Sequence, residues 1–118
     1  MSVEVSEKFS KTDRILKRDD FRRVYEKGRK LQARYFSAFV LPNSLGRSRI
    51  GITATRKFGN SVERNRARRL IREAFRRNKV IAPAGMDLVI NVKRALNDAS
   101  YRDLEGDFVA LLKMAGNQ

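Results

Sequence analysis

The chain has 118 residues, with 27 Lys and Arg against 13 Asp and Glu, and it contains no His and no Cys. This length fits one compact domain, and the net charge of +14 favours a polyanionic partner, nucleic acid above all. The missing Cys and His exclude disulfides, thiol nucleophiles, imidazole bases and zinc sites built on either residue.

The apolar runs of the sequence have only the length of a strand, whereas a membrane-spanning helix needs about 18 apolar residues. Residues 1–13 mix acids and bases and lack the apolar stretch of a secretory signal. We therefore expect a cytoplasmic location, no membrane partner, a flexible N-terminal arm at residues 1–13 and a single domain at residues 14–118.

A short helix is expected first. Asp19 or Asp20 can cap it, Phe21 and Tyr25 share one of its faces, and Gly28 ends it.

Two strands are predicted next, at residues 35–41 and 49–55, on either side of a turn-prone segment at residues 42–46. Their proximity along the chain favours an antiparallel hairpin. A further short strand at residues 29–32 has a weaker signal.

A long helix follows the strands. Asn60 and Glu63 have the spacing of a capping box that opens a helix reaching about Lys79.

The C-terminal third has a structural pattern. The apolar, β-branched run at residues 86–93 predicts a buried, central strand. Ser100 and Asp103 can cap a last helix that ends at Gly116. The order of elements predicts a two-layer sandwich of the α+β or α/β class, in which a small mixed sheet is layered with three helices.

The positive charge is concentrated in the long helix and the turn before it. Residues 56–79 carry ten basic and two acidic side chains, whereas residues 80–118 carry four and five. At 100° per residue, an apolar stripe lies opposite an almost entirely cationic face. This outward face holds Asn65, Arg68, Arg69, Arg72, Arg76 and Lys79.

Like charges four residues apart destabilise a helix, and an anionic partner would relieve that cost. The planar fork of Arg suits phosphate, and Arg56, Lys57 and Gly59 could add a phosphate site at the start of the helix. The alternatives are a solvated charged face for the helix and a Gly59 that only makes a turn. Glu73 and Arg77 are expected to form a simple surface pair.

Residues 55–76, TRKFGNSVERNRARRLIREAFR, strongly resemble the RNR signature of the bacterial ribonuclease P protein component. Residues 20–28, DFRRVYEKG, and the spacing of the last strand and helix extend this resemblance over residues 14–115. It implies a fold like ribosomal protein S5 domain 2, with a left-handed βαβ crossover that the usual handedness rule would oppose.

The resemblance also implies a function. The chain would be an RNA-binding subunit that partners the catalytic RNA of ribonuclease P and binds precursor tRNA, and it would assist removal of the 5′ leader. Catalytic groups would belong to the RNA and to Mg²⁺ held through the RNA subunit and substrate, with no catalytic or metal-binding residue in this chain, no organic cofactor and no required protein partner.

The resemblance assigns binding residues to two surfaces. The signature residues expected to face the catalytic RNA are Arg56, Lys57, Arg64, Asn65, Arg66, Arg68, Arg69 and Arg72, to which the outward face of the helix adds Arg76. The leader would lie in a cleft between the first helix and the sheet, and its aromatic positions match Phe21, Tyr25 and Phe39. Tyr35 is added to this cleft because it shares the strand face of Phe39 in the predicted strand. Ordinary core packing is the alternative for Phe21 and Tyr35, and Arg64 could serve the local structure instead of a partner.

Two other classes of function are open to a chain of this composition. A ribosomal or other structural RNA-binding protein would share its charge and its basic helix. A self-sufficient metal nuclease would need carboxylates, for which the candidates are Asp19, Asp20, Asp87, Asp103 and Asp107.

Overall fold

The computed structural model describes residues 13–15 and 17–116, and its helices and strands follow the predicted order with bounds within two residues of the predicted ones. The elements are α1 (Arg18–Lys27), β1 (Arg29–Gln32), β2 (Phe36–Pro42), β3 (Arg49–Thr53), α2 (Ser61–Arg77), β4 (Met86–Val92), η3 (Arg94–Asp98) and α3 (Tyr101–Gly116). The weakly signalled strand at residues 29–32 is present as β1, whereas the short 3-10 helix η3 was not predicted.

The four strands form one mixed sheet in the order β1-β2-β4-β3. The predicted hairpin between β2 and β3 is therefore wrong, because β4 lies between them, antiparallel to β2 and parallel to β3. The physical reason is burial: five successive residues of β4, Met86 to Ile90, are buried, so this strand takes the central position that has neighbours on both edges.

The parallel pair β3 and β4 is joined by α2, which makes a βαβ unit. The strands of this unit are direct neighbours, with Ile50 opposite Leu88. The left-handed crossover that the resemblance implies stays a prediction.

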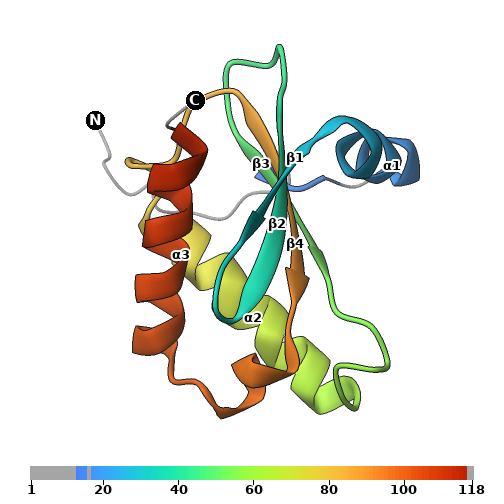
Figure 1. Cartoon of the computed structure of the whole chain (residues 1–118), viewed down its shortest axis with the longest axis vertical. Helices are drawn as coiled ribbons and strands as arrows, with labels where there is room; N and C mark the ends of the chain where they lie inside the picture. The colour runs from blue at the N-terminus through green and yellow to red at the C-terminus, as the bar shows by residue number, and fades with distance from the viewer. Residues whose placement is uncertain (1–12, 16, 117–118) are drawn as a thin grey trace.

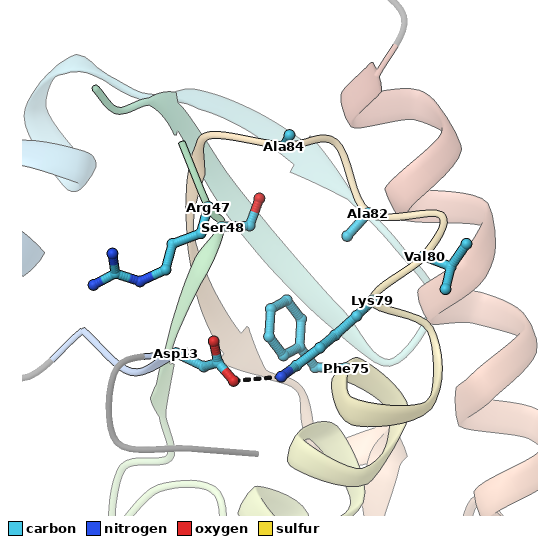
Figure 2. A pocket seen from close by; sticks show the side chains of 8 residues that line it. All are labelled: Asp13, Arg47, Ser48, Phe75, Lys79, Val80, Ala82 and Ala84. Atoms are coloured by element: carbon cyan, nitrogen blue, oxygen red, sulfur yellow. Dashed lines mark hydrogen bonds and ion pairs between the residues drawn. The ribbon is translucent and has the colours of Figure 1, made fainter. Parts of the chain in front are cut away.

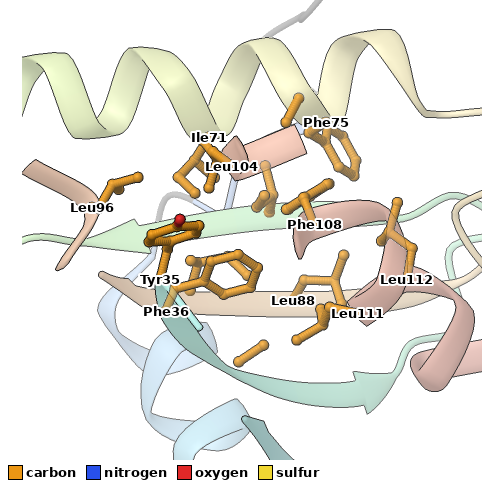
Figure 3. Packing of buried hydrophobic residues seen from close by; sticks show 14 of the residues in the cluster. Tyr35, Phe36, Ile71, Phe75, Leu88, Leu96, Leu104, Phe108, Leu111 and Leu112 are labelled. Carbon is orange, nitrogen blue, oxygen red and sulfur yellow. The ribbon is translucent and has the colours of Figure 1, made fainter. Parts of the chain in front are cut away.

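Helices cover the sheet unequally on its two faces (Figure 1). On one face α2 and α3 enclose the larger core, in which Phe36, Ile71, Leu88 and Phe108 are fully buried (Figure 3). On the other face α1 covers a small cluster of Ile15, Val24 and Val89. Because α1 has only ten residues, it leaves side chains of the strands partly exposed on its side.

The two long helices begin as the sequence predicts. The Asn60 side chain accepts a hydrogen bond from the Glu63 N–H at 2.9 Å, and Glu63 Oε1 accepts one from the Asn60 N–H at 2.9 Å. At α3 the Asp103 N–H donates to Ser100 Oγ at 3.1 Å. Both capping boxes satisfy N–H groups that a helix start leaves unpaired.

The start of α1 differs from the prediction. Lys17 occupies the N-cap position without a side-chain cap, and Asp19 and Asp20 lie in the first turn. Carboxylates in the first turn still stabilise the helix through its dipole. The predicted position of Asp19 and Asp20 at the helix start is therefore confirmed, but their predicted capping role is wrong.

The predicted N-terminal arm, residues 1–13, lies outside the described residues except for Asp13, which is 8% exposed and belongs to the packed structure. None of the helices in the described ranges is long and apolar enough to cross a membrane.

Candidate nucleic-acid interface

The outward face of α2 forms an open pocket of about 450 Å³. Its lining includes four arginines of the helix, one arginine from the N-terminal segment, an amide and a single carboxylate: Arg14, Asn65, Arg68, Arg69, Arg72, Glu73 and Arg76. We call this the α2 arginine pocket. The structure thus brings five of the predicted RNA-binding residues together on one face of the helix.

Positive charges lie close together in the α2 arginine pocket. Partial burial lowers the pKa of Arg72, and the neighbouring charges of Arg14 and Arg68 lower it further. Glu73 offsets the charge at one end, because it accepts hydrogen bonds from Arg76 Nε at 3.0 Å and Arg77 Nε at 2.8 Å. The predicted Glu73–Arg77 pair is confirmed, and Arg76 joins it.

Arg64 and Arg66 lie on either side of the apolar stripe of α2, outside this pocket. Arg64 Nη1 donates to the Gly59 carbonyl at 2.7 Å, and Arg66 Nη2 donates to the Ala99 carbonyl at 2.8 Å. These bonds connect α2 to the turn that precedes it and to the residue that follows η3. Each guanidinium group thus makes a structural contact within the chain, and the RNA contacts predicted for Arg64 and Arg66 stay predictions.

Arg56 and Lys57 lie in the exposed turn before α2. Gly59 follows, and a Cβ there would lie 2.3 Å from Glu63 Oε1. A side chain at this position would displace the Glu63 carboxylate of the capping box, so Gly59 contributes to the start of the helix. The phosphate site expected beside it stays a prediction.

A second candidate surface lies on the α1 side of the sheet. The rings of Tyr25 and Phe39 meet edge to face with centroids 5.0 Å apart, and Lys30 Nζ lies 5.6 Å from the Phe39 centroid. The Tyr25 hydroxyl donates to Asn91 Oδ1 at 2.7 Å. We call these four residues together with Phe21 the aromatic surface.

Phe21 is a partly buried member of the aromatic surface. It packs against the cluster of Ile15, Val24 and Val89, and a Cβ on Gly51 would lie 2.6 Å from its ring. The glycine of β3 therefore makes room for this ring. Phe21 contributes to the docking of α1 as well as to the surface, whereas Tyr25 is 36% exposed.

Tyr35 is not on the aromatic surface, and its predicted place beside Phe39 is wrong. It is 8% exposed and belongs to the larger core, beside Phe36 (Figure 3). β2 begins only at Phe36, so the alternation of faces, which holds within an extended strand, does not reach Tyr35. Its N–H donates instead to Asp107 Oδ2 at 2.9 Å.

The sequence did not single out Arg14, Lys30 or Asn91. Lys30 reaches Phe39 because β1 pairs with β2 in a register that sets these two residues opposite each other. Arg14 reaches α2 because its segment runs beside β3. Strand order and register are long-range properties, and the local pattern carries no signal for either contact.

Four of the five carboxylates considered for a metal nuclease have structural partners, namely Asp20, Asp87, Asp103 and Asp107. Asp87 is fully buried and accepts hydrogen bonds from Arg49 Nη2 at 2.7 Å and Asn43 Nδ2 at 2.8 Å. Burial alone would raise the pKa of Asp87, but the bonds from Arg49 and Asn43 outweigh it and hold that pKa below its ordinary value. Within the described residues, no three His, Cys, Asp or Glu side chains gather as metal ligands would.

Known proteins are similar to this chain in both sequence and fold. The sequence model of the Ribonuclease P family matches residues 9–116. A ribonuclease P protein component of Pelotomaculum thermopropionicum is 40% identical over 103 residues, which cover 87% of this chain and 92% of the relative. The solved RNase P protein of Thermotoga maritima superposes with a TM-score of 0.80 at 34% identity, covering 86% of this chain and 96% of that one. A solved RNase P protein of Staphylococcus aureus gives a TM-score of 0.80 at 31% identity, with coverages of 87% and 94%.

Proposed function

Since the chain belongs to the ribonuclease P protein family, we propose that it is the protein subunit of this ribonucleoprotein and binds both its catalytic RNA and the 5′ leader of precursor tRNA. Its role is to assist the endonucleolytic removal of the leader, which gives the mature 5′ end of the tRNA. The working location is the cytoplasm.

The α2 arginine pocket is the observation that carries this proposal. Four arginines of one helix face, with Arg14 beside them, line a single open pocket. Guanidinium groups form paired hydrogen bonds with phosphate oxygens, and a folded RNA presents phosphates at the required density. We assign the catalytic RNA to this pocket and to Arg56 and Lys57, which are exposed in the turn just before the start of α2.

The aromatic surface is the proposed site of the leader. Single-stranded nucleic acids are held by base stacking on aromatic rings beside positive charge. Tyr25 and Phe39 present such rings, and Lys30 supplies the charge. The two proposed RNA surfaces lie on opposite faces of the sheet, so one protein subunit could contact both RNAs at once.

We place Mg²⁺ on the RNA subunit and substrate. The chain has no His or Cys, and the carboxylates considered above that the structure pairs, such as Asp87 and Asp107, bind arginine, amide or backbone donors. Magnesium supplies Lewis-acid stabilisation of charge at the scissile phosphate. This chain would contribute positive charge and the positioning of RNA.

The test is a cleavage assay with a precursor tRNA that bears a 5′ leader, at low magnesium, where electrostatic help from the protein matters most. The chain alone, the cognate catalytic RNA alone and the two together are compared. We expect efficient formation of the mature 5′ end only with both. Cleavage by the chain alone would identify a protein nuclease, and a folded, RNA-binding chain that gives no enhancement would identify a structural RNA-binding protein.

A further inference from the structure

The segment of residues 13–15 is held in place by three anchors. Asp13 Oδ2 accepts from Lys79 Nζ, just beyond the end of α2, at 2.5 Å (Figure 2). The Ile15 N–H donates to the Ile50 carbonyl at 2.9 Å, and the Ile15 side chain is 4% exposed in the cluster beneath α1. The residue between these anchors, Arg14, is therefore fixed along the edge of β3.

Arg14 approaches the outward face of α2 from this position. Its side chain is exposed and lines the same pocket as Arg68 and Arg72. The charge of Arg14 contributes to the lowered pKa of Arg72, which agrees with their proximity. Two separate segments of the chain thus present guanidinium groups to one space.

We propose that Arg14 is a fifth cation of the α2 arginine pocket and that Arg14 and Arg72 together bind a backbone phosphate of the catalytic RNA. This inference rests on the proposed function. It adds a binding residue outside the helical signature, because Arg14 lies 41 positions before Thr55, where the signature begins.

A phosphate suits this arrangement for three reasons. Each guanidinium can donate paired hydrogen bonds to phosphate oxygens, and groups on two segments can contact the anion from different sides. The anchors at Asp13 and Ile15 hold the backbone at Arg14 in place, so binding orders little besides the side chain itself. A phosphate also lowers the repulsion between neighbouring arginines.

The test measures binding of the full-length chain to the catalytic RNA over a series of salt concentrations. Arg14→Ala should weaken binding about tenfold, as expected for loss of a charge-assisted hydrogen bond, and should lower the magnitude of the salt slope by about 0.7 to 0.9. Arg14→Lys should recover only part of the affinity, because an ammonium group lacks the planar fork.

Arg102→Ala is the matched control, because it removes one exposed arginine from α3, outside the pocket lining. It should change affinity less than twofold. Circular dichroism should show the wild-type fold for each variant, since the bridge of Arg14 to Ile50 belongs to the backbone.

Asp13→Asn separates local positioning from total charge. This change makes the chain more positive, so a general attraction to RNA would strengthen binding. If the Asp13–Lys79 pair holds Arg14 at the pocket, affinity should fall about threefold in spite of the added charge. Tighter binding of Asp13→Asn would overturn this positioning of Arg14.

The outcomes distinguish this inference from the function on which it rests. Wild-type affinity in Arg14→Ala, while the wild-type chain binds the catalytic RNA, would overturn the assignment of Arg14 alone. No binding of the wild-type chain to the catalytic RNA would overturn both. A loss seen only for precursor tRNA, measured with preassembled complex, would also reject the catalytic RNA as the source of the phosphate.

Discussion

At the scale of a single residue, a substitution of Phe39 tests the proposed binding of the leader to the aromatic surface. Phe39→Ala should reduce the preference of the assembled complex for precursor over mature tRNA about 5- to 150-fold, because stacking of a base on an aromatic side chain contributes ~1–3 kcal/mol. Competitive binding of the two tRNAs measures this preference. Affinity for the catalytic RNA should be nearly unchanged.

Phe39→Leu is the control for packing. Leucine can still pack against the cluster beneath α1, which Phe39 joins as a partly buried member, but it has no ring on which a base could stack. Full preference for precursor tRNA in Phe39→Leu would show that packing, and not stacking, explains the effect of alanine.

Asp87 tests the stability of the α1 side of the sheet. Its buried carboxylate binds Arg49 and Asn43 and lies 3.3 Å from Arg23 Nη2 on α1. Asp87→Asn should lower the free energy of unfolding by about 3 kcal/mol, because it removes the negative charge that compensates Arg49 and Arg23 at a buried site. Urea unfolding measures the loss, and the exposed Asp98→Asn should change stability by less than about 0.5 kcal/mol.

The same carboxylate predicts a pH dependence. The pKa of Asp87 is lower in the folded chain than its ordinary value, so the unfolded chain takes up its proton first as pH falls. The stability from this group is complete above about pH 5 and is lost as pH falls below about 4 toward the lowered folded pKa. Asp87→Asn should therefore show a shallower loss of stability between pH 5 and pH 2 than the wild-type chain, and equal slopes would contradict this origin.

At the scale of an element, α2 is the part of the fold that carries most of the proposed RNA contact. Arg68→Ala combined with Arg72→Ala should weaken binding to the catalytic RNA by about two to four orders of magnitude, since hydrogen bonds to charged groups contribute ~1.5–3 kcal/mol each. The preference for precursor over mature tRNA, measured at saturating protein, should persist. Filter binding and cleavage assays test the two properties separately.

The double variant can be distinguished from a misfolded chain. Arg68 and Arg72 lie on the outward side of α2, whereas Ala67 and Ile71 form its buried side, so the helix content should be preserved. Equal losses of catalytic-RNA binding and of leader preference would reject the assignment of these functions to separate surfaces.

At the scale of the whole molecule, net charge predicts steep salt dependence. The logarithm of the association constant should fall linearly with the logarithm of salt concentration, by ~0.7–0.9 for each phosphate neutralised. If each of the four α2 arginines in the pocket neutralises one phosphate, the slope is about −3 or steeper. Affinity that is independent of salt would contradict a polyanionic partner.

The sequence by itself determined the elements and the chemistry of the main surface. Capping residues, helical spacing and a buried strand pattern are local signals, and they located α2, β4 and α3 within two residues. The cationic face of α2 follows from the same spacing, because each residue turns the helix by about 100°.

Only the tertiary structure decided which segments meet. It inserted β4 between β2 and β3, placed Tyr35 in the larger core and brought Arg14 to α2. Strand order, register and the packing of distant segments depend on how the whole chain buries its apolar surface, and that is a long-range property which residues adjacent in the sequence do not encode.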